Sequence, residues 1–162
     1  MLVTRKQLLM IASGTEHAHK TTFFHNVFCV RCAYTALTSV KAIALVGWSP
    51  KPDRPSHRVA DYLKRKGYRV IPVNPGQAGQ QALGETVRAS LADIAEPVDM
   101  IDIFRRSEEV GPVVDEAIAS GAKVIWMQLG IENPDAAAKA KASGMEVVMN
   151  RCPAIEIPRL GL

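Results

Sequence analysis

The feature that most constrains the fold is an apolar run that ends in glycine and leads through a proline-rich loop into an amphipathic segment. The run is Ile43–Val46, Gly47 follows it, and residues 48–56 read WSPKPDRPS. Such a run is typical of a buried parallel strand, and glycine lets the backbone turn tightly and approach a ligand. A helix that begins near Pro55 offers N–H groups without partners and a partial positive charge. The motif therefore predicts a site for a phosphate-bearing ligand, with Arg54 as a partner of the phosphate.

The spacing differs from that of a dinucleotide fingerprint. Gly47 stands alone, whereas a G-x-G-x-x-G motif has three glycines. Nicotinamide-binding chains usually carry an acid at the end of the second strand, about 20 residues further on, and this segment reads Val73-Asn74-Pro75. Asn74 can hydrogen-bond but has no charge. The pattern favours a ligand with a phosphorylated ribose, near Lys51 or Arg54. The alternative is an NAD(P)-dependent or other nucleotide-dependent enzyme of the Rossmann class.

Apolar runs alternate with helical patterns from residue 41 onward. The expected strands are Lys41–Val46, Arg69–Val73 with Pro72 at its end, Val98–Phe104, Ala122–Met127 and Met145–Met149, with a short strand near Thr86–Arg88 and a helical turn near Leu91–Ile94. The expected helices are Pro55–Lys66, one that Ser107 caps and that ends at Gly121, and one that Asn133 caps and that ends before Gly144. This alternation predicts an α/β fold: a Rossmann-like, doubly wound parallel sheet in three α/β/α layers.

Ligands of such sheets bind beyond the carboxyl ends of the strands. Glycines, polar residues and aromatics gather at these ends: Gly47-Trp48-Ser49, Asn74-Pro75, Phe104-Arg105, Gln128-Leu129-Gly130 and Asn150-Arg151-Cys152.

Catalytic groupings are sparse by comparison. The sequence after residue 41 contains neither a Ser/His/Asp nor a Cys/His grouping. Asp99 and Asp102 lie at odd spacing and should face opposite sides of the sheet, with Asp102 anchoring loop backbone groups and Asp99 solvated. His57 is expected to be an exposed residue of a first helical turn, and Trp126 to belong to the core. We therefore expect no catalytic residue and no metal site, so the chain is more plausibly a binding protein than an enzyme.

Residues 1–36 differ from the rest and are expected to form a poorly ordered extension before a domain at 37–162. The extension contains His17, His19 and His25 and the CxxC pair Cys29–Cys32, but it lacks the two well-spaced ligand pairs of a zinc site. Its basic, hydroxyl-rich composition resembles a transit peptide. An upstream start codon is the alternative origin.

Composition narrows the function classes. The chain has 162 residues, 48% hydrophobic and 22% charged, and no apolar run near the roughly 20 residues that cross a membrane. Residues 1–41 hold five basic residues and one acidic residue, whereas 42–162 are balanced at 15 of each. We expect a single cytoplasmic domain without a membrane or nucleic-acid partner.

Five segments in order resemble the family of small, single-domain CoA-binding proteins, which are similar to the CoA-binding domain of the succinyl-CoA synthetase α subunit. They are ALVGWSPKPDRPS (44–56), GYRVIPVNPG (67–76), VDMIDIFRR (98–106), VIWMQLGI (124–131) and NRCPAIE (150–156). The resemblance covers about residues 38–160.

The resemblance implies a Rossmann-like domain that binds coenzyme A or an acyl-CoA and has no established reaction. Such a protein serves as a carrier, a sensor or a regulatory module. The implied site residues are Gly47, Trp48, Ser49, Arg54, Pro55, Ser56, Asn74, Pro75, Phe104, Arg105, Gln128 and Gly130. Trp48 stands where a small residue is common and is expected to narrow the pocket mouth. The second domain and the phosphorylatable histidine of the synthetases are missing, so ligase activity is not implied.

Cys152 follows Arg151 just past the last expected strand. One hypothesis is that the guanidinium favours the thiolate, which then forms a mixed disulfide with the thiol of coenzyme A under oxidation. The other is that Cys152 is a small apolar residue packed beneath the C-terminal tail.

Overall fold

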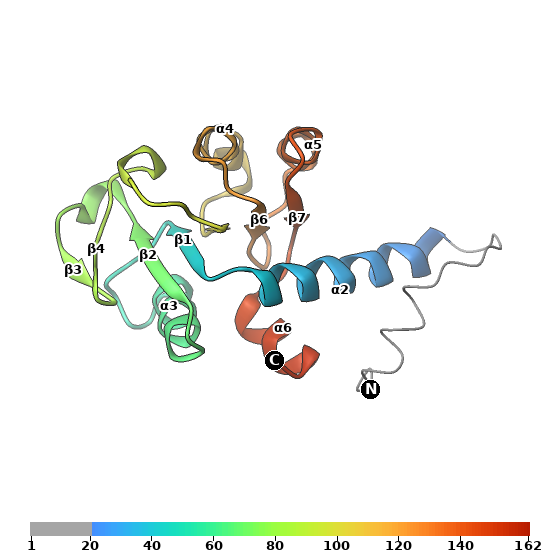
Figure 1. Ribbon diagram of the computed structural model, residues 1–162, viewed down its shortest axis with the longest axis horizontal. Coiled ribbons are helices and arrows are strands. Elements are labelled where there is room, and N and C mark those ends of the chain that lie inside the picture. The colour runs from blue at the N-terminus through green and yellow to red at the C-terminus, as the bar shows by residue number, and fades with distance from the viewer. Residues whose placement is uncertain (1–20) are drawn as a thin grey trace.

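The computed structural model describes the backbone of residues 21–162 and the side chains from residue 30 onward. Five parallel strands form one sheet in the order β2-β1-β5-β6-β7 (Figure 1). Their bounds are Ala42–Val46 (β1), Arg69–Val73 (β2), Met100–Ile103 (β5), Val124–Met127 (β6) and Glu146–Val148 (β7). The expected Rossmann-like α/β fold is confirmed.

Helices cover both faces of this sheet (Figure 1). One face carries α2 (Thr21–Ser39), α3 (Pro55–Arg65) and α6 (Pro153–Leu160), and the other carries α4 (Val110–Ser120) and α5 (Pro134–Ala142). Each face has its own core, around Leu45 and Trp126 on the first and around Ile101 and Val114 on the second.

The strand order places a switch point between β1 and β5. From β1 the chain moves to β2 at one edge of the sheet, and then returns past β1 to β5, from which it continues to β6 and β7. The connections on the two sides of β1 therefore diverge at the carboxyl ends of β1 and β5, where open α/β sheets form their ligand crevice.

Local signals account for several helix ends. Asn133 caps α5, because its Oδ1 accepts a hydrogen bond from the N–H of Ala136 at 2.9 Å, and Pro134 occupies the first helical position. Gly121 ends α4 in the left-handed conformation, at φ 75°. α3 buries Val59 and Leu63 against the sheet, as its amphipathic pattern predicts.

Pro72 lies inside β2 rather than at its end. It is the fourth of five residues and pairs with Leu45. The position tolerates proline because β2 is an edge strand and the Pro72 C=O faces outward, where it accepts the N–H of Arg88 at 2.9 Å. The expected short strand near Thr86–Arg88 is a small hairpin, β3 (Gln81–Ala82) and β4 (Glu85–Thr86), followed by a bridge from Arg88 to Val73.

One helix prediction is corrected, and one helix is missing from the sequence prediction. Ser107 does not cap α4, because a 3₁₀ turn, η3 (Ser107–Glu109), precedes the helix, and the Ser107 hydroxyl accepts the N–H of Glu132 instead. Helix α6 was not predicted, although its first residue is a proline in a favoured position. The expected turn near Leu91 is the 3₁₀ turn η2 (Leu91–Asp93), and a further one, η1 (Pro75–Gln77), follows β2.

The boundary expected between residues 36 and 37 falls inside α2. Ala33 and Ala36 are fully buried, and the Tyr68 hydroxyl donates to the C=O of Leu37 at 2.8 Å. Small side chains let this helix approach the core closely, so Ala33 and Ala36 pack with the domain. Residues 1–20 lie outside the described part of the chain. Among the described residues, no helix is both long and apolar enough to cross a membrane.

Candidate functional site

The turn after β1 requires glycine. Gly47 has φ +92°, and a Cβ at this position would lie 2.5 Å from the backbone oxygen of Phe104, at the end of β5. The N–H groups of Gly47 and Trp48 both donate to the C=O of Val73, at 2.9 and 3.3 Å. The ends of β1, β2 and β5 are thus held together at this turn.

Asn74 stabilises the loops around the turn. Its Nδ2 donates to the C=O of Trp48 at 2.6 Å, and its Oδ1 accepts the N–H of Gly76 at 2.9 Å. Both polar side-chain atoms are therefore engaged within the protein. Asn74 thus links the loop after β1 to the turn that begins at Pro75.

Trp48 does not lie at a pocket mouth, contrary to expectation. It is only 4% exposed and packs in the core that α3 covers. Its ring stacks on His57, with centroids 6.3 Å apart. Its Nε1–H is buried without a hydrogen-bond partner in the described part of the chain.

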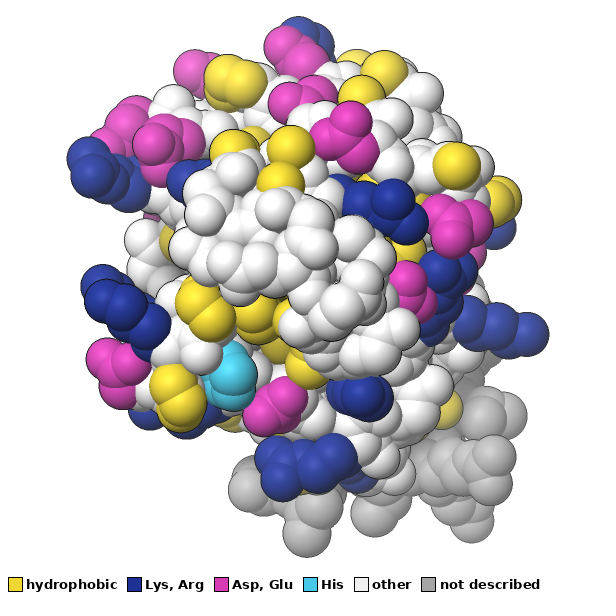
Figure 2. Space-filling model, turned by 90° about the vertical axis from the view of Figure 1, so that its left-hand side faces the viewer, with side chains coloured by type: hydrophobic (Ala, Val, Ile, Leu, Met, Phe, Trp, Pro, Cys, Tyr) yellow, Lys and Arg dark blue, Asp and Glu magenta, His cyan; other side chains and the backbone are white. Residues whose placement is uncertain are grey.

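His57 is half-buried rather than exposed. Its Nδ1 lies 3.1 Å from the C=O of Ser49, and its Nε2 lies 3.5 Å from Asp61. Part of the imidazole is exposed to solvent. On the face of the molecule shown in Figure 2, basic and acidic side chains are interspersed rather than gathered by sign.

The start of α3 offers positive potential. Arg54 is the N-cap residue and makes no side-chain cap, Pro55 follows it, and Ser56 is buried. Lys51 and Arg54 are exposed and Arg105 is half-buried. Within the described residues none of these three cations takes part in an ion pair. They are available to an anion, as is the positive end of the helix dipole.

A cavity of about 450 Å³ opens at the carboxyl ends of β1 and β2, on the side of α4. Two predicted residues, Pro75 and Arg105, line it, and Val46 and Val73 form its floor at the strand ends. Its remaining walls come from the loop after β4 and from the start of α4: Ala89, Ser90, Leu91, Glu108, Glu109, Pro112, Val113 and Glu116. Sequence reasoning missed these walls, because no local signal marks residues that only tertiary packing brings to a cavity.

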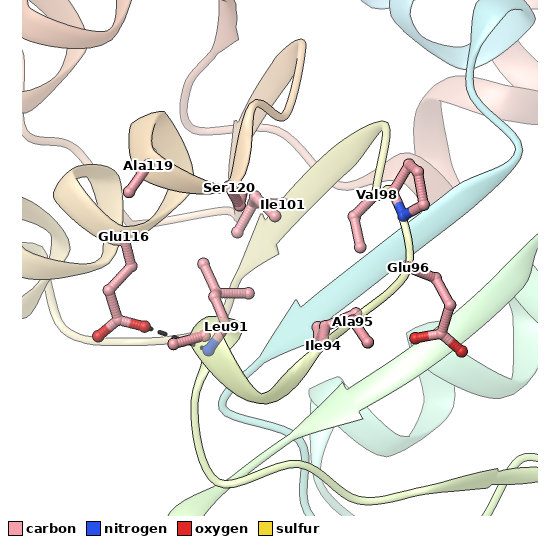
Figure 3. Close-up of a pocket in the computed structure, with 11 residues that line it drawn as sticks. Leu91, Ile94, Ala95, Glu96, Val98, Ile101, Glu116, Ala119 and Ser120 are labelled. Carbon is pink, nitrogen blue, oxygen red and sulfur yellow. Dashed lines mark hydrogen bonds between the residues drawn. The ribbon is translucent and has the colours of Figure 1, made fainter.

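A second cavity, of about 460 Å³, lies on the same face toward the amino end of β5 (Figure 3). Apolar side chains such as Ile94, Val98 and Ile101 line most of it. Leu91 and Glu116 line both cavities, and the Leu91 N–H donates to the Glu116 carboxylate at 3.2 Å (Figure 3). The second cavity is slightly larger, but it lies away from the carboxyl ends of the strands, where the predicted site residues are found.

Gln128 lies at the carboxyl end of β6, but its side chain is buried. Its Nε2 donates to both carboxylate oxygens of Asp102, at 2.8 and 3.1 Å. Asp102 is fully buried, and burial raises its pKa to about 7, although the hydrogen bond from Gln128 opposes this rise. Asp102 thus binds a side chain, not loop backbone. Asp99 anchors the backbone instead, because its Oδ2 accepts hydrogen bonds from the N–H groups of Lys41 and Ala42. These hydrogen bonds lower the pKa of Asp99.

Cys152 is buried in the core beneath α6. Burial raises the pKa of its thiol, and the nearby Asp102 adds to the rise. The Arg151 guanidinium pairs with Glu156 at 3.0 Å. The expected thiolate is therefore disfavoured, and the packing hypothesis is supported.

Trp126 is a core residue, as predicted, and its Nε1–H donates to the C=O of Arg151.

The remaining predicted residues lie at neighbouring strand ends. Phe104 is half-buried and packs against the core, and the N–H of exposed Gly130 donates to Asn150.

Among residues 30–162, no three His, Cys, Asp or Glu side chains lie close enough together to hold a metal ion. The zinc or redox candidates His17 and His19 lie outside the described residues, as do the side chains of His25 and Cys29.

Comparison with known proteins agrees with this geometry. A family model described as "CoA binding domain" matches residues 41–158. The chain belongs to this CoA-binding domain family. The protein YneT of Bacillus subtilis (strain 168) is 41% identical over 112 residues, which are 69% of this chain and 82% of YneT.

Two solved structures have the same fold over most of the chain. The structure of cell-free ID.343 from Thermus thermophilus has a TM-score of 0.77 and 38% identity, and the match covers 81% of this chain and 98% of that one. A hypothetical protein from Pyrococcus horikoshii OT3 has the same TM-score and 34% identity, over 91% of this chain and 100% of its own.

Proposed function

We propose that this protein binds coenzyme A at the carboxyl ends of its strands. The observation that carries the proposal is the 450 Å³ cavity beside the Gly47 turn, with Arg105 in its wall. In the proposed pose the adenosine of the ligand occupies this cavity, and the phosphates lie outside it, away from the carboxylates of Glu108, Glu109 and Glu116 in its wall. The phosphates lie near Ser49, Arg54 and the start of α3, and the pantetheine arm runs across the strand ends toward the loop after β6.

The cations support the phosphate assignment. Arg54 is exposed at a helix start that no side chain caps, and a guanidinium matches the geometry of phosphate oxygens. The N–H groups of Gly47 and Trp48 are already used by Val73, so the phosphates depend on the residues that follow. We assign to Gly47 the close approach of the backbone and to Ser49, Arg54 and Ser56 the contacts.

The proposed role is that of a carrier, sensor or regulatory module. Asp102 is enclosed with Gln128, and Cys152 is a buried thiol with a raised pKa, so neither is suited to act on a ligand in the cavity. The cytoplasm is the compartment that suits this role, because its reducing poise keeps the thiol of coenzyme A free.

An NAD(P)-dependent enzyme remains the second candidate from sequence. The coenzyme A proposal is preferred because Asn74 carries no charge at the position where a nicotinamide site has an acid for the ribose. No described residue supplies the missing acid there.

Calorimetry with purified protein tests the assignment. Coenzyme A should bind, whereas NAD and NADP should not. Arg54→Ala should lose roughly 1.5–3 kcal/mol of binding free energy, the range for a hydrogen bond to a charged group. Arg65→Ala is the matched control, because Arg65 is an exposed arginine in the last turn of the same helix. If Arg54→Ala binds coenzyme A as tightly as the natural protein does, the phosphates do not bind at the start of α3, and the assignment is wrong.

A further inference from the structure

Asn150 has an unusual backbone conformation for its place in the fold. Among the described residues, two that are not glycine have positive φ: Leu83 at 58° and Asn150 at 56°. Leu83 and Gly84 form the turn of the β3–β4 hairpin, where a left-handed backbone is required. Asn150 follows β7 at the carboxyl edge of the sheet and lies in no hairpin. A left-handed residue outside a turn carries a conformational cost that its surroundings must offset.

The side chain of Asn150 supplies the compensation. Its Oδ1 accepts the N–H of Gly130 at 2.8 Å, and its Nδ2 donates to the Glu132 carboxylate at 2.5 Å. One amide therefore binds two points of the loop after β6. The neighbouring backbone adds a third contact, because the N–H of Arg151 donates to the C=O of Met127 at 3.2 Å.

The same loop is held from its other side by the segment after β5. The Ser107 hydroxyl accepts the N–H of Glu132 at 3.0 Å, and the Ser107 C=O accepts Nδ2 of Asn133 at 2.9 Å. Between these two supports, the loop places the side chain of Leu129 in solvent, 56% exposed. A large apolar side chain held outward at a ligand-bearing edge is available for contact with a ligand.

The loop lies where the arm of the ligand would pass. β1 and β6 are separated only by β5, so their carboxyl ends are about 10 Å apart at the usual strand spacing. The nucleotide cavity lies on the β2 side of this span and has no lining residue from the loop after β6. Contacts from this loop would therefore be made with the arm and not with the nucleotide.

We propose that Asn150 is a positioning residue for the half of the site that receives the pantetheine arm of coenzyme A. It acts by holding Leu129 and Gly130 in one arrangement. This inference rests on the proposed function.

The experiment compares two ligands and three proteins by calorimetry. The ligands are coenzyme A and 3′-phospho-ADP, which is its nucleotide half without the arm. Asn150→Gly keeps the left-handed backbone without strain but removes both side-chain bonds, and Asn150→Asp keeps the acceptor for Gly130. Asn150→Gly should weaken coenzyme A binding about tenfold and leave 3′-phospho-ADP unchanged. Asn150→Asp should recover part of the loss.

Leu83→Gly is the matched control, because it makes the same change at the other left-handed residue, in a hairpin whose Gly84 lies beside Lys64 at the far end of α3. It should leave both affinities unchanged. Equal coenzyme A affinity in Asn150→Gly and the natural protein would overturn the inference, as would a parallel loss for both ligands. If the natural protein binds neither ligand, the proposed function itself fails and this inference fails with it.

Discussion

Replacing Asp102 by Asn should raise the stability of the variant relative to the natural protein as the pH rises from 5 to 8. Asp102 is fully buried, and its pKa is raised from 3.8 to about 7. Between these two values the folded protein holds a proton that the unfolded chain releases. Stability therefore falls as the pH rises through this window. An asparagine side chain is neutral throughout and can still accept the hydrogen bond from Gln128.

The magnitude follows from the width of the window. From pH 5 to pH 7 the natural protein should lose about 1.4 kcal/mol of unfolding free energy per pH unit, or about 3 kcal/mol by pH 8. The Asp102→Asn variant loses none of this. Its advantage over the natural protein should therefore grow by about 3 kcal/mol between pH 5 and pH 8, whatever its value at pH 5.

Urea unfolding, followed by tryptophan fluorescence at several pH values, measures this difference. Asp99→Asn is the matched control, because Asp99 is a partly exposed carboxylate whose pKa is lowered by backbone hydrogen bonds. That variant should be destabilised by a nearly constant amount over the same range. Parallel stability curves for Asp102→Asn and the natural protein would show that Asp102 does not titrate in the window and would refute the reasoning.

Three further predictions concern other parts of the chain. Gly47→Ala should destabilise the fold by roughly 1–3 kcal/mol, because its Cβ would meet Phe104 and its φ is positive, and a lowered melting temperature together with weaker coenzyme A binding would show this. Cys152 should react slowly with iodoacetamide and form no adduct with CoA disulfide in intact-mass measurements, since burial and Asp102 disfavour its thiolate; a reducible adduct would restore the mixed-disulfide hypothesis. A chain that begins at residue 30 should melt cooperatively and bind coenzyme A as the full chain does, and insolubility would show that the preceding residues are needed.

Sequence reasoning succeeded where one short segment determines the outcome. The cap of α5 could be predicted because Asn133 and Pro134 act on their own helix. β1 and the turn at Gly47 could be predicted because an apolar run and a lone glycine carry their own backbone preferences. The family resemblance joined five such segments, and the family match over residues 41–158 confirms it.

Prediction from the sequence failed for side chains whose contacts are made with residues distant in the sequence. Ser107 has the chemistry of a helix cap, but Glu132, 25 residues away, uses its hydroxyl. For Asp102 the sequence predicts a loop-backbone partner, because nothing in its own strand indicates Gln128, which follows β6. Trp48 lies in a polar loop after Gly47, and nothing in that segment indicates the distant core residues against which its ring packs. The Arg54 and Arg105 assignments remain predictions until a ligand is measured.

Pro72 has a consequence for association between chains. An edge strand normally presents free N–H and C=O groups that a second chain can pair with, which is a route to aggregation. On the outer side of β2, Pro72 has no N–H, and its C=O is occupied by Arg88. The next outward-facing residue, Asn74, donates its N–H to the C=O of the same Arg88 at 2.8 Å. This end of β2, which borders the proposed coenzyme A cavity, therefore offers no free backbone group with which another strand could pair.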